Sequence, residues 1–438
     1  MSRDGARASV AVVTLGCKAN HYDSAVLRDR LRDAGFEVVR ESETADAYLV
    51  NSCTVTQRSD FQARQMARRC KRRNPEARVL LVGCYAQTQP EACAAAEGVD
   101  LVIGNQARHR IPQLLGDLLQ GRVSPALPSG AAIADFGDRV PDFERARPYL
   151  KIQDGCDDRC AYCAVPDARG PSRSLPPEPV LERIAELGRR GYREVVLSGV
   201  HLGRYGRDLS PPTDLASLIE AIEATGACQR VRLSSLEPQA IDADLLEALL
   251  RSQILCRHLH LPLQSGDDDV LRKMGRPYRA ARFVEVVRTV LAIWPDAAIG
   301  ADVIVGLPGE DEAAFARTEA LVGELPLAYL HVFPFSPRPG TRAGDLPDRP
   351  PQRVASERAG RMRELSVALR ARFREQALGR EHEVLVETEV RGEAGMLRGT
   401  SRNYVPFRFE GEASLINELV PVHAESLFDD HVQGRLVG

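Results

Sequence analysis

Three closely spaced cysteines are the most chemically informative feature of the sequence. Cys156, Cys160 and Cys163 follow one another at a three-then-two spacing, so one tight loop can direct three thiolates at a single point. Thiolates hold iron–sulfur clusters, and a cubane cluster has four irons, so three protein ligands leave one iron open. An open coordination position is typical of a catalytic metal site. The alternatives are chance or a structural zinc site, although structural zinc usually has four ligands and the next cysteine here is Cys228.

A second group of three cysteines is spread over the first part of the chain. Cys17, Cys53 and Cys84 each come just after a strand-like run. Ligand sites of open α/β sheets lie beyond the carboxyl ends of the strands, so these residues are expected to converge and to hold a second three-thiolate cluster. The alternative is that they are buried core cysteines. Four others are interpreted as structural, namely Cys70, Cys93, Cys228 and Cys256.

The elements that must position these cysteines form two α/β series. In residues 1–120, strand-like runs alternate with helix-like runs, which predicts a doubly wound parallel sheet. Residues 121–147, rich in Pro, Gly, Ala and Asp, are interpreted as a linker. Six further strand–helix repeats fall within residues 148–375 and predict a partial (β/α)6 barrel, because a complete barrel needs eight. Short alternating strands in residues 376–438 predict a small C-terminal β-barrel.

Polar and glycine-rich strand ends in the second series predict a ring of ligand-binding residues. Barrel chemistry lies at the C-terminal ends of the strands, and glycines there allow a ligand to approach the backbone closely. Ordinary loop chemistry is the alternative for each position taken alone. The candidates for cofactor binding are Ser198, Gly199, Glu237, Gln264, Ser265 and Gly306.

Composition limits the remaining possibilities. The 438-residue chain is 44% hydrophobic and 27% charged, and its formal net charge is −3, so no global basic field indicates nucleic acid. A predicted helix at 57–73 carries seven Arg and Lys residues against one Asp, which leaves a local phosphate contact open beside an ordinary solvated face. With no signal-like or membrane-length apolar run, a cytoplasmic protein is expected, and its ten cysteines are expected to be metal ligands or free thiols.

The cysteine loop and its surroundings resemble radical S-adenosylmethionine enzymes. The additional Cys17, Cys53 and Cys84 make the chain similar to the methylthiotransferase family, which carries two cubane clusters and replaces a C–H bond with C–S–CH₃. His21 and Asp167 depart from the expected pattern. Four stretches resemble the branch that acts on N6-threonylcarbamoyladenosine next to the anticodon, at position 37 of tRNA: 14–20, 259–266, 302–310 and 331–336.

The resemblance implies a division of labour between the two cysteine groups. Cys156, Cys160 and Cys163 would hold the cluster that binds and reductively cleaves S-adenosylmethionine, with Tyr162 near the adenine. The resulting deoxyadenosyl radical would take hydrogen from C2 of the target adenine. The other three cysteines would hold an auxiliary cluster that presents methylated sulfur. The hard chemistry is thus delegated to cofactors.

The resemblance leaves several partners and alternatives open. An electron donor such as flavodoxin or ferredoxin is expected, and the sulfur donor is unknown. The alternatives within the family are isopentenyladenosine in tRNA and an aspartate of a ribosomal protein. A non-catalytic iron–sulfur RNA-binding protein is the alternative from another class.

The C-terminal barrel resembles a TRAM domain, a tRNA-binding module. From Gln376 onward it has six Arg, no Lys and eleven acidic residues, a net charge of −5 that is poor for a generic phosphate binder. A barrel that only packs on the middle domain is the alternative. The candidate RNA contacts are Arg398, Arg402, Tyr404, Phe407 and Arg408.

Overall fold

The computed structural model describes residues 7–122, 130 and 135–437. The chain divides into two compact units. Unit 1 comprises Met1–Asp142, Gln153–Arg173 and Ser336–Gly344, and unit 2 comprises Phe143–Ile152, Ser174–Phe335 and Asp345–Gly438. Of the predicted linker 121–147, residues 123–129 and 131–134 lie outside the described part, and the described remainder contains no helix or strand.

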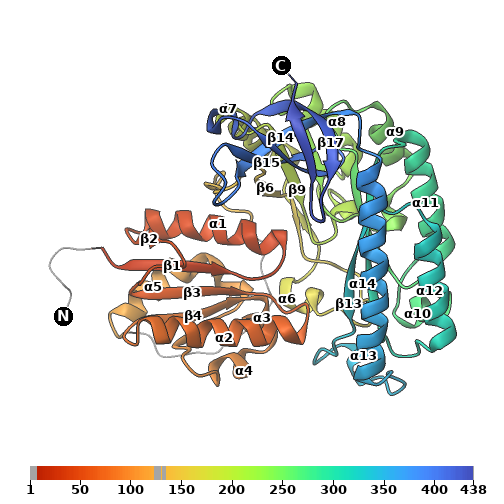
Figure 1. Ribbon diagram of the computed structural model, residues 1–438. Coiled ribbons are helices and arrows are strands. Elements are labelled where there is room, and N and C mark those ends of the chain that lie inside the picture. The colour runs from red at the N-terminus through yellow and green to blue at the C-terminus, as the bar shows by residue number, and fades with distance from the viewer. Residues whose placement is uncertain (1–6, 123–129, 131–134, 438) are drawn as a thin grey trace. The chain divides into compact units, whose positions relative to one another are not determined.

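Unit 1 is built on a five-stranded parallel sheet in the order β2-β1-β3-β4-β5, which confirms the predicted doubly wound fold (Figure 1). Its central strand β3 is buried at every position because helices cover both faces of the sheet. The strands are β1 (Ser9–Thr14), β2 (Glu37–Val39), β3 (Ala47–Ser52), β4 (Arg78–Gly83) and β5 (Leu101–Ile103).

Two apolar clusters hold the helices of unit 1 to opposite faces of this sheet. Leu27 and Leu31 of α1 and Leu115 of α5 pack on one face, whereas Ala63 and Ala67 of α2 pack on the other. The helical segments are α1 (Lys18–Asp33), α2 (Gln57–Arg73), α3 (Cys84–Thr88), α4 (Pro90–Ala94), η1 (Asn105–Arg110) and α5 (Ile111–Leu119), with β7 (Gln153–Asp154) and α6 (Val165–Arg169) from the later segment.

Unit 2 contains six parallel strands in two three-stranded sheets, of order β10-β9-β6 and β11-β12-β13. Isolated parallel bridges, Val231 to Leu255 and Ser235 to His260, bring β10 beside β11, so the predicted partial barrel is confirmed. The strands are β6 (Tyr149–Lys151), β9 (Glu194–Ser198), β10 (Arg230–Leu233), β11 (His258–Gln264), β12 (Ala298–Val305) and β13 (Tyr329–Pro334).

Helices alternate with these strands, and several begin at an aspartate N-cap. Asp214, Asp242, Asp267 and Asp311 each accept a hydrogen bond from a backbone N–H of the first turn. The helices are α7 (Pro177–Arg189), α8 (Leu215–Thr225), α9 (Ala243–Arg251), α10 (Asp268–Lys273), α11 (Ala280–Ile293), α12 (Glu312–Glu324) and α14 (Gln352–Glu375), with η2 (Leu202–Arg204) and η3 (Pro238–Ala240) between them. The division between the units falls within α13 (Arg342–Asp345) and within the short β8 (Arg173–Ser174).

The last part of unit 2 is a closed barrel in the order β14-β15-β16-β18-β17, as predicted. Its interior is filled by alternating residues that include Val386, Phe407 and Phe409. The elements are β14 (Glu381–Glu389), β15 (Met396–Ser401), β16 (Pro406–Glu410), η4 (Ala413–Leu415), β17 (Leu419–Leu427) and β18 (Val432–Leu436). None of the helices in the described ranges has the length and apolar character that crossing a membrane requires.

Candidate cluster-binding site

The group of Cys17, Cys53 and Cys84 lies at the carboxyl ends of three adjacent strands of unit 1. Cys17 follows β1 and occupies the N-cap of α1, Cys53 follows β3 directly, and Cys84 follows β4 as the first residue of α3. Because β1, β3 and β4 are neighbours, the sheet brings together residues that are far apart in sequence. All three are free thiols.

Two tight turns shape this edge of the sheet. Gly16 has φ +98°, and a Cβ there would lie 2.5 Å from Cys53 Cβ and 2.8 Å from Cys53 Sγ. Asn20, one turn into α1, donates from Nδ2 to Leu15 O (2.7 Å) and to Ser52 O (3.0 Å). A glycine and a short amide thus allow the β1 and β3 loops to meet closely around Cys53.

The surroundings of these thiols fit a cluster of thiolate-ligated iron. Burial, and then the proximity of Cys17 and Cys84, raises the pKa of the Cys53 thiol to about 12. Three neighbouring thiolates repel one another unless a positive group lies between them. A bound metal ion provides that charge and deprotonates the thiols that coordinate it. Asn105 Nδ2 donates to Cys84 Sγ at 3.6 Å, the kind of hydrogen bond that tunes a ligating sulfur.

The group of Cys156, Cys160 and Cys163 lies in the loop between β7 and α6, which also belongs to unit 1. Cys160 is buried, and Cys156, Tyr162 and Cys163 are half-buried. Gly155 starts the loop with φ +74°, and a Cβ there would lie 2.0 Å from Pro171 O. The loop closes where Cys156 N donates to Gly170 O (3.0 Å), so glycine is required at its entry.

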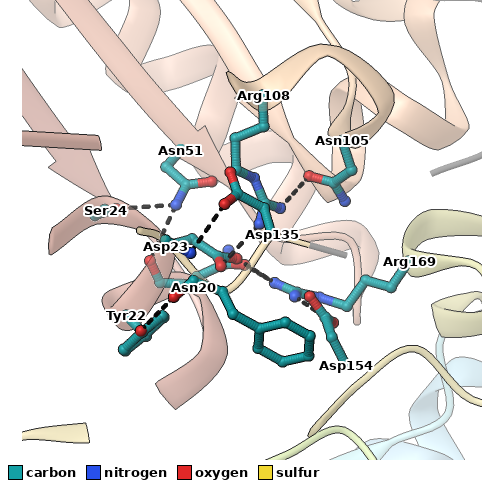
Figure 2. Close-up of polar contacts among 12 residues, drawn as sticks. Asn20, Tyr22, Asp23, Ser24, Asn51, Asn105, Arg108, Asp135, Asp154 and Arg169 are labelled. Carbon is teal, nitrogen blue, oxygen red and sulfur yellow. Dashed lines mark hydrogen bonds and ion pairs between the residues drawn. The ribbon is translucent and has the colours of Figure 1, made fainter. Parts of the chain in front are cut away.

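A buried arginine, Arg169, joins the two cysteine groups (Figure 2). It lies at the end of α6, and its guanidinium donates to Asp154 Oδ1 (2.8 Å), Asp23 Oδ2 (2.9 Å) and Asn20 Oδ1 (2.6 Å). Burial opposes its charge, but Asp154, the thiolate of Cys84, Asp23 and Cys17 hold the pKa of Arg169 well above its usual value. One permanently charged fork therefore holds the Cys156 loop against α1.

A second buried arginine completes this network. Arg108 NH1 pairs with the other oxygen of Asp23, Oδ1, at 2.8 Å, and Arg108 NH2 donates to Asn105 Oδ1. Asn105 in turn donates to Ala168 O at 2.7 Å, next to Arg169 in sequence. Two carboxylates, those of Asp23 and Asp154, thus balance two guanidinium groups without access to water.

Sequence reasoning did not identify this network. Only two signals pointed to it. Asp154 and Arg169 flank the three-cysteine loop, and Asn20 and Asp23 lie three residues apart on the helix that begins at Cys17, so they share a helix face.

The predicted cofactor residues of unit 2 are mostly engaged in internal contacts. Gly199 N donates to Ser234 Oγ at 3.3 Å, and Ser198 ends β9 in a buried position. Glu237 forms an ion pair with Arg276. Ser265 Oγ lies 3.3 Å from Thr318 Oγ1, and a Cβ at Gly306 would lie 2.6 Å from Ala355 Cβ. Their role in binding S-adenosylmethionine stays a prediction.

Gln264 is the position in this set with an unusual conformation. It ends β11 with φ +65°, a left-handed backbone that is uncommon for a residue other than glycine. Its Oε1 is buried and has no hydrogen-bond partner within the described ranges. An unsatisfied acceptor on a strained backbone is typical of a ligand contact.

A His–Asp–His cluster in unit 2 was also missed from the sequence. His260, Asp302 and His331 come from β11, β12 and β13, and Asp302 Oδ1 lies 2.9 Å from His260 Nε2 and 3.3 Å from His331 Nδ1. Burial opposes ionisation, but hydrogen bonds from both histidines lower the pKa of Asp302. The three groups stand on neighbouring strands, and Asp302 is paired in register with His331.

Of the five RNA contacts predicted in the C-terminal barrel, the structure overturns Phe407, and the other four stay predictions. Phe407 is fully buried in the barrel core, and the ring of Tyr404 lies 4.2 Å from that of His258. Arg402 Nε donates to Leu255 O at 3.0 Å, and Arg408 pairs with Asp430 at 3.1 Å. Of the five residues, Arg398 is the exposed one without such a contact. The others dock the barrel on the strands of unit 2 or stabilise it internally.

The four cysteines interpreted as structural, Cys70, Cys93, Cys228 and Cys256, are buried free thiols. Burial raises the pKa of Cys70 and Cys228 to about 11 and that of Cys256 to about 12, and it also raises the pKa of Cys93. They therefore remain neutral core residues.

Comparison with known proteins gives the family. Residues 9–104 match "Uncharacterized protein family UPF0004", and residues 150–322 match the Radical SAM superfamily. The chain is 36% identical to a Thermotoga maritima relative named threonylcarbamoyladenosine tRNA methylthiotransferase MtaB, over 97% of this chain and 96% of that one. It is 32% identical to a Pelotomaculum thermopropionicum relative named tRNA-2-methylthio-N(6)-dimethylallyladenosine synthase, over 97% of both chains.

A solved structure agrees in fold. The radical S-adenosylmethionine methyltransferase TsrM from Kitasatospora setae superposes with a TM-score of 0.57 at 16% identity, over 77% of each chain. The match to the Radical SAM superfamily and the similarity to the relatives define a radical S-adenosylmethionine enzyme, which implies a [4Fe–4S] cluster and S-adenosylmethionine as cofactors. Within that class, the chain belongs to the radical S-adenosylmethionine methylthiotransferase family.

Proposed function

We propose that this protein transfers a methylthio group to C2 of N6-threonylcarbamoyladenosine at position 37 of tRNA. The observation that carries the proposal is the union of two three-cysteine groups in one compact unit, joined by Arg169. The relatives from Thermotoga maritima and Bacillus subtilis, at 36% and 37% identity, carry the corresponding name and support the choice of nucleoside.

Each of the two three-cysteine groups could hold one cubane cluster. Cys156, Cys160 and Cys163 would hold one, and the cysteines at the ends of β1, β3 and β4 would hold the other. When bound, the first supplies the electron that cleaves S-adenosylmethionine and the second supplies sulfur to be transferred. The chain itself fixes the ligands: Gly155 permits the loop to turn, and Arg169 and Asp154 keep that loop against α1.

Iron content tests the two-cluster arrangement. Anaerobically reconstituted protein is expected to hold about eight irons per chain. Replacing Cys17, Cys53 and Cys84 with alanine should leave about four irons, and so should replacing the other three. A parent protein that holds only about four irons would show that one group does not bind a cluster.

The nucleoside is tested in cells. Mass spectrometry of tRNA nucleosides from a deletion strain should show loss of 2-methylthio-N6-threonylcarbamoyladenosine, and a plasmid copy should restore it. The 2-methylthio isopentenyl nucleoside should be unchanged. Loss of the isopentenyl derivative instead would assign the activity of the Pelotomaculum relative, and no change in either would refute a tRNA substrate.

A further inference from the structure

Helix α2 carries a strongly basic surface that the cluster-binding site does not use. The helix has seven Arg and Lys residues and one acidic residue, Asp60. Asp60 is buried and accepts hydrogen bonds from Arg338 and from Thr54, so it does not offset the exposed charges. The buried positions Asp60, Ala63, Ala67 and Cys70 define the inner side of the helix.

The opposite side forms one continuous basic stripe. At about 100° per residue, seven positions fall within about 120° of the helix circumference. Four of them are the exposed arginines Arg58, Arg68, Arg69 and Arg72. The three positions between them are Phe61, Gln62 and Gln65, so no carboxylate interrupts the stripe. It runs for about 21 Å, given a rise of about 1.5 Å per residue.

Most of these arginines are available to an external anion. Within the described ranges, Arg58, Arg69 and Arg72 form no ion pair, and Arg68 pairs with an exposed Glu97 at 3.4 Å. The side chain of Phe61 lies between them and is 48% exposed. A large exposed aromatic among unpaired guanidinium groups is not what an ordinary solvated helix face presents.

We infer that this stripe binds RNA, with the arginines on backbone phosphates and Phe61 stacked on an unpaired base. Guanidinium groups match phosphate oxygens in a bidentate manner, and aromatic side chains stack on any base. The helix begins four residues after Cys53, so the stripe is continuous with the loop that carries that ligand. The inference rests on the proposed tRNA substrate and adds the surface that holds it.

The C-terminal barrel is a poorer phosphate binder, since its six arginines are outnumbered by eleven acidic residues and three of the six, Arg402, Arg408 and Arg435, are engaged within unit 2. Arg402 and Tyr404 are held against unit 2, and Arg408 pairs with Asp430. On the exposed side of α2, by contrast, no carboxylate of the helix offsets the positive charge needed for phosphate binding.

The salt dependence of RNA binding tests the inference. We would measure the Kd of the holoenzyme for an anticodon stem-loop RNA containing N6-threonylcarbamoyladenosine between 50 and 200 mM salt. A plot of the logarithm of the association constant against the logarithm of salt concentration has a negative slope. The triple variant Arg58→Gln, Arg69→Gln, Arg72→Gln should make that slope shallower by about 2. Over this fourfold salt range, the variant should therefore lose about 16-fold less affinity than the parent.

A matched control removes the same number of charges elsewhere. Arg189, Arg251 and Arg353 are exposed and each pairs with a glutamate on its own helix, so replacing them with Gln should leave the slope unchanged. Phe61→Ala should weaken binding roughly 5- to 100-fold without changing the slope. Iron content and Tm equal to those of the parent would show that each variant is folded.

The outcomes separate this inference from the proposed function. A triple variant with the parental slope, or a control with an equal loss of slope, would overturn the assignment to α2 while leaving the substrate in place. A parent enzyme with no affinity for the RNA would overturn both. Loss of slope in the triple variant alone supports the stripe as the RNA-binding surface.

Discussion

Replacing Arg169 with methionine should loosen the part of unit 1 that holds the cysteines. The guanidinium has two carboxylate partners at 2.8 and 2.9 Å, and all three side chains are at most 3% exposed. Breaking a buried ion pair from one side costs about 3–5 kcal/mol, because a carboxylate is left in a medium that solvates it poorly. Asp23 keeps Arg108, so the loss falls mainly on Asp154 and Asn20. We therefore expect Arg169→Met to lower the free energy of unfolding by about 3 kcal/mol, the lower end of that range.

This loss corresponds to a measurable shift in melting temperature. For domains of 150–250 residues, 1 kcal/mol shifts Tm by about 2–4 °C, so Arg169→Met should lower it by about 6–12 °C. Differential scanning calorimetry on anaerobically prepared holoenzyme gives the shift. Hydrogen exchange in peptides from β1 and β3 shows that it belongs to unit 1. Iron content should fall as well, because Asp154 and Arg169 hold the loop of Cys156.

Arg159 provides the control, since it lies within the same loop. Its ion pair with Asp167 spans 3.2 Å, but the two side chains are 77% and 55% exposed, so the pair is worth at most about 1 kcal/mol. Arg159→Met should shift Tm by no more than about 4 °C. If the Arg169→Met variant had the same Tm as the Arg159→Met variant and kept its iron, the buried network would not be what holds the loop.

Three further outcomes follow from the geometry. Gly155→Ala should destabilise unit 1 by more than the about 1–2 kcal/mol of left-handed strain, because its Cβ meets a backbone oxygen, whereas Gly35→Ala, with φ +89° and open space around it, should show the strain alone in chemical denaturation. Tyr404→Ala should lower Tm through loss of about 1–2 kcal/mol of aromatic contact in unit 2, with unchanged affinity for RNA by titration. Asp302→Asn should be less stable than the parent at neutral pH. Folding lowers the pKa of Asp302, so the charged carboxylate stabilises the parent above about pH 4, the ordinary carboxyl value. The difference in Tm between the parent and the variant should therefore narrow as the pH falls below that value, as a pH series of melting curves would show.

Local patterns in the sequence predicted most of the elements closely. The helix expected at 57–73 spans Gln57–Arg73, and six strands that alternate with helices lie within the expected range 148–375. Such boundaries follow from apolar periodicity and from glycines and aspartates at the ends, which act within a few residues of the chain. The convergence of Cys17, Cys53 and Cys84 was predictable for a related reason, because parallel strands place equivalent loops on one edge of the sheet.

What could not be predicted depends on contacts between distant parts of the chain. Arg169 meets Asp23 across 146 residues, and no local pattern distinguishes a buried arginine from the many exposed ones in this sequence. The same limit explains why Phe407, which is fully buried, was expected to contact RNA. An aromatic residue beside arginines looks alike in sequence whether it faces a nucleotide or a neighbouring strand, and the register of the barrel decides which.

The excess of acid in the C-terminal barrel has a structural explanation. Glu383, Glu387 and Glu418 are all on the barrel, and they pair with Arg230, Arg147 and Arg193 of the strand-and-helix part of unit 2. The Arg147 and Arg193 pairs span 2.8 and 2.9 Å. The net charge of −5 therefore complements an arginine-rich surface within the same unit rather than a phosphate backbone. A module whose acidic residues dock against its own chain is a poor phosphate binder, whereas the exposed stripe of helix α2 carries four arginines and no carboxylate.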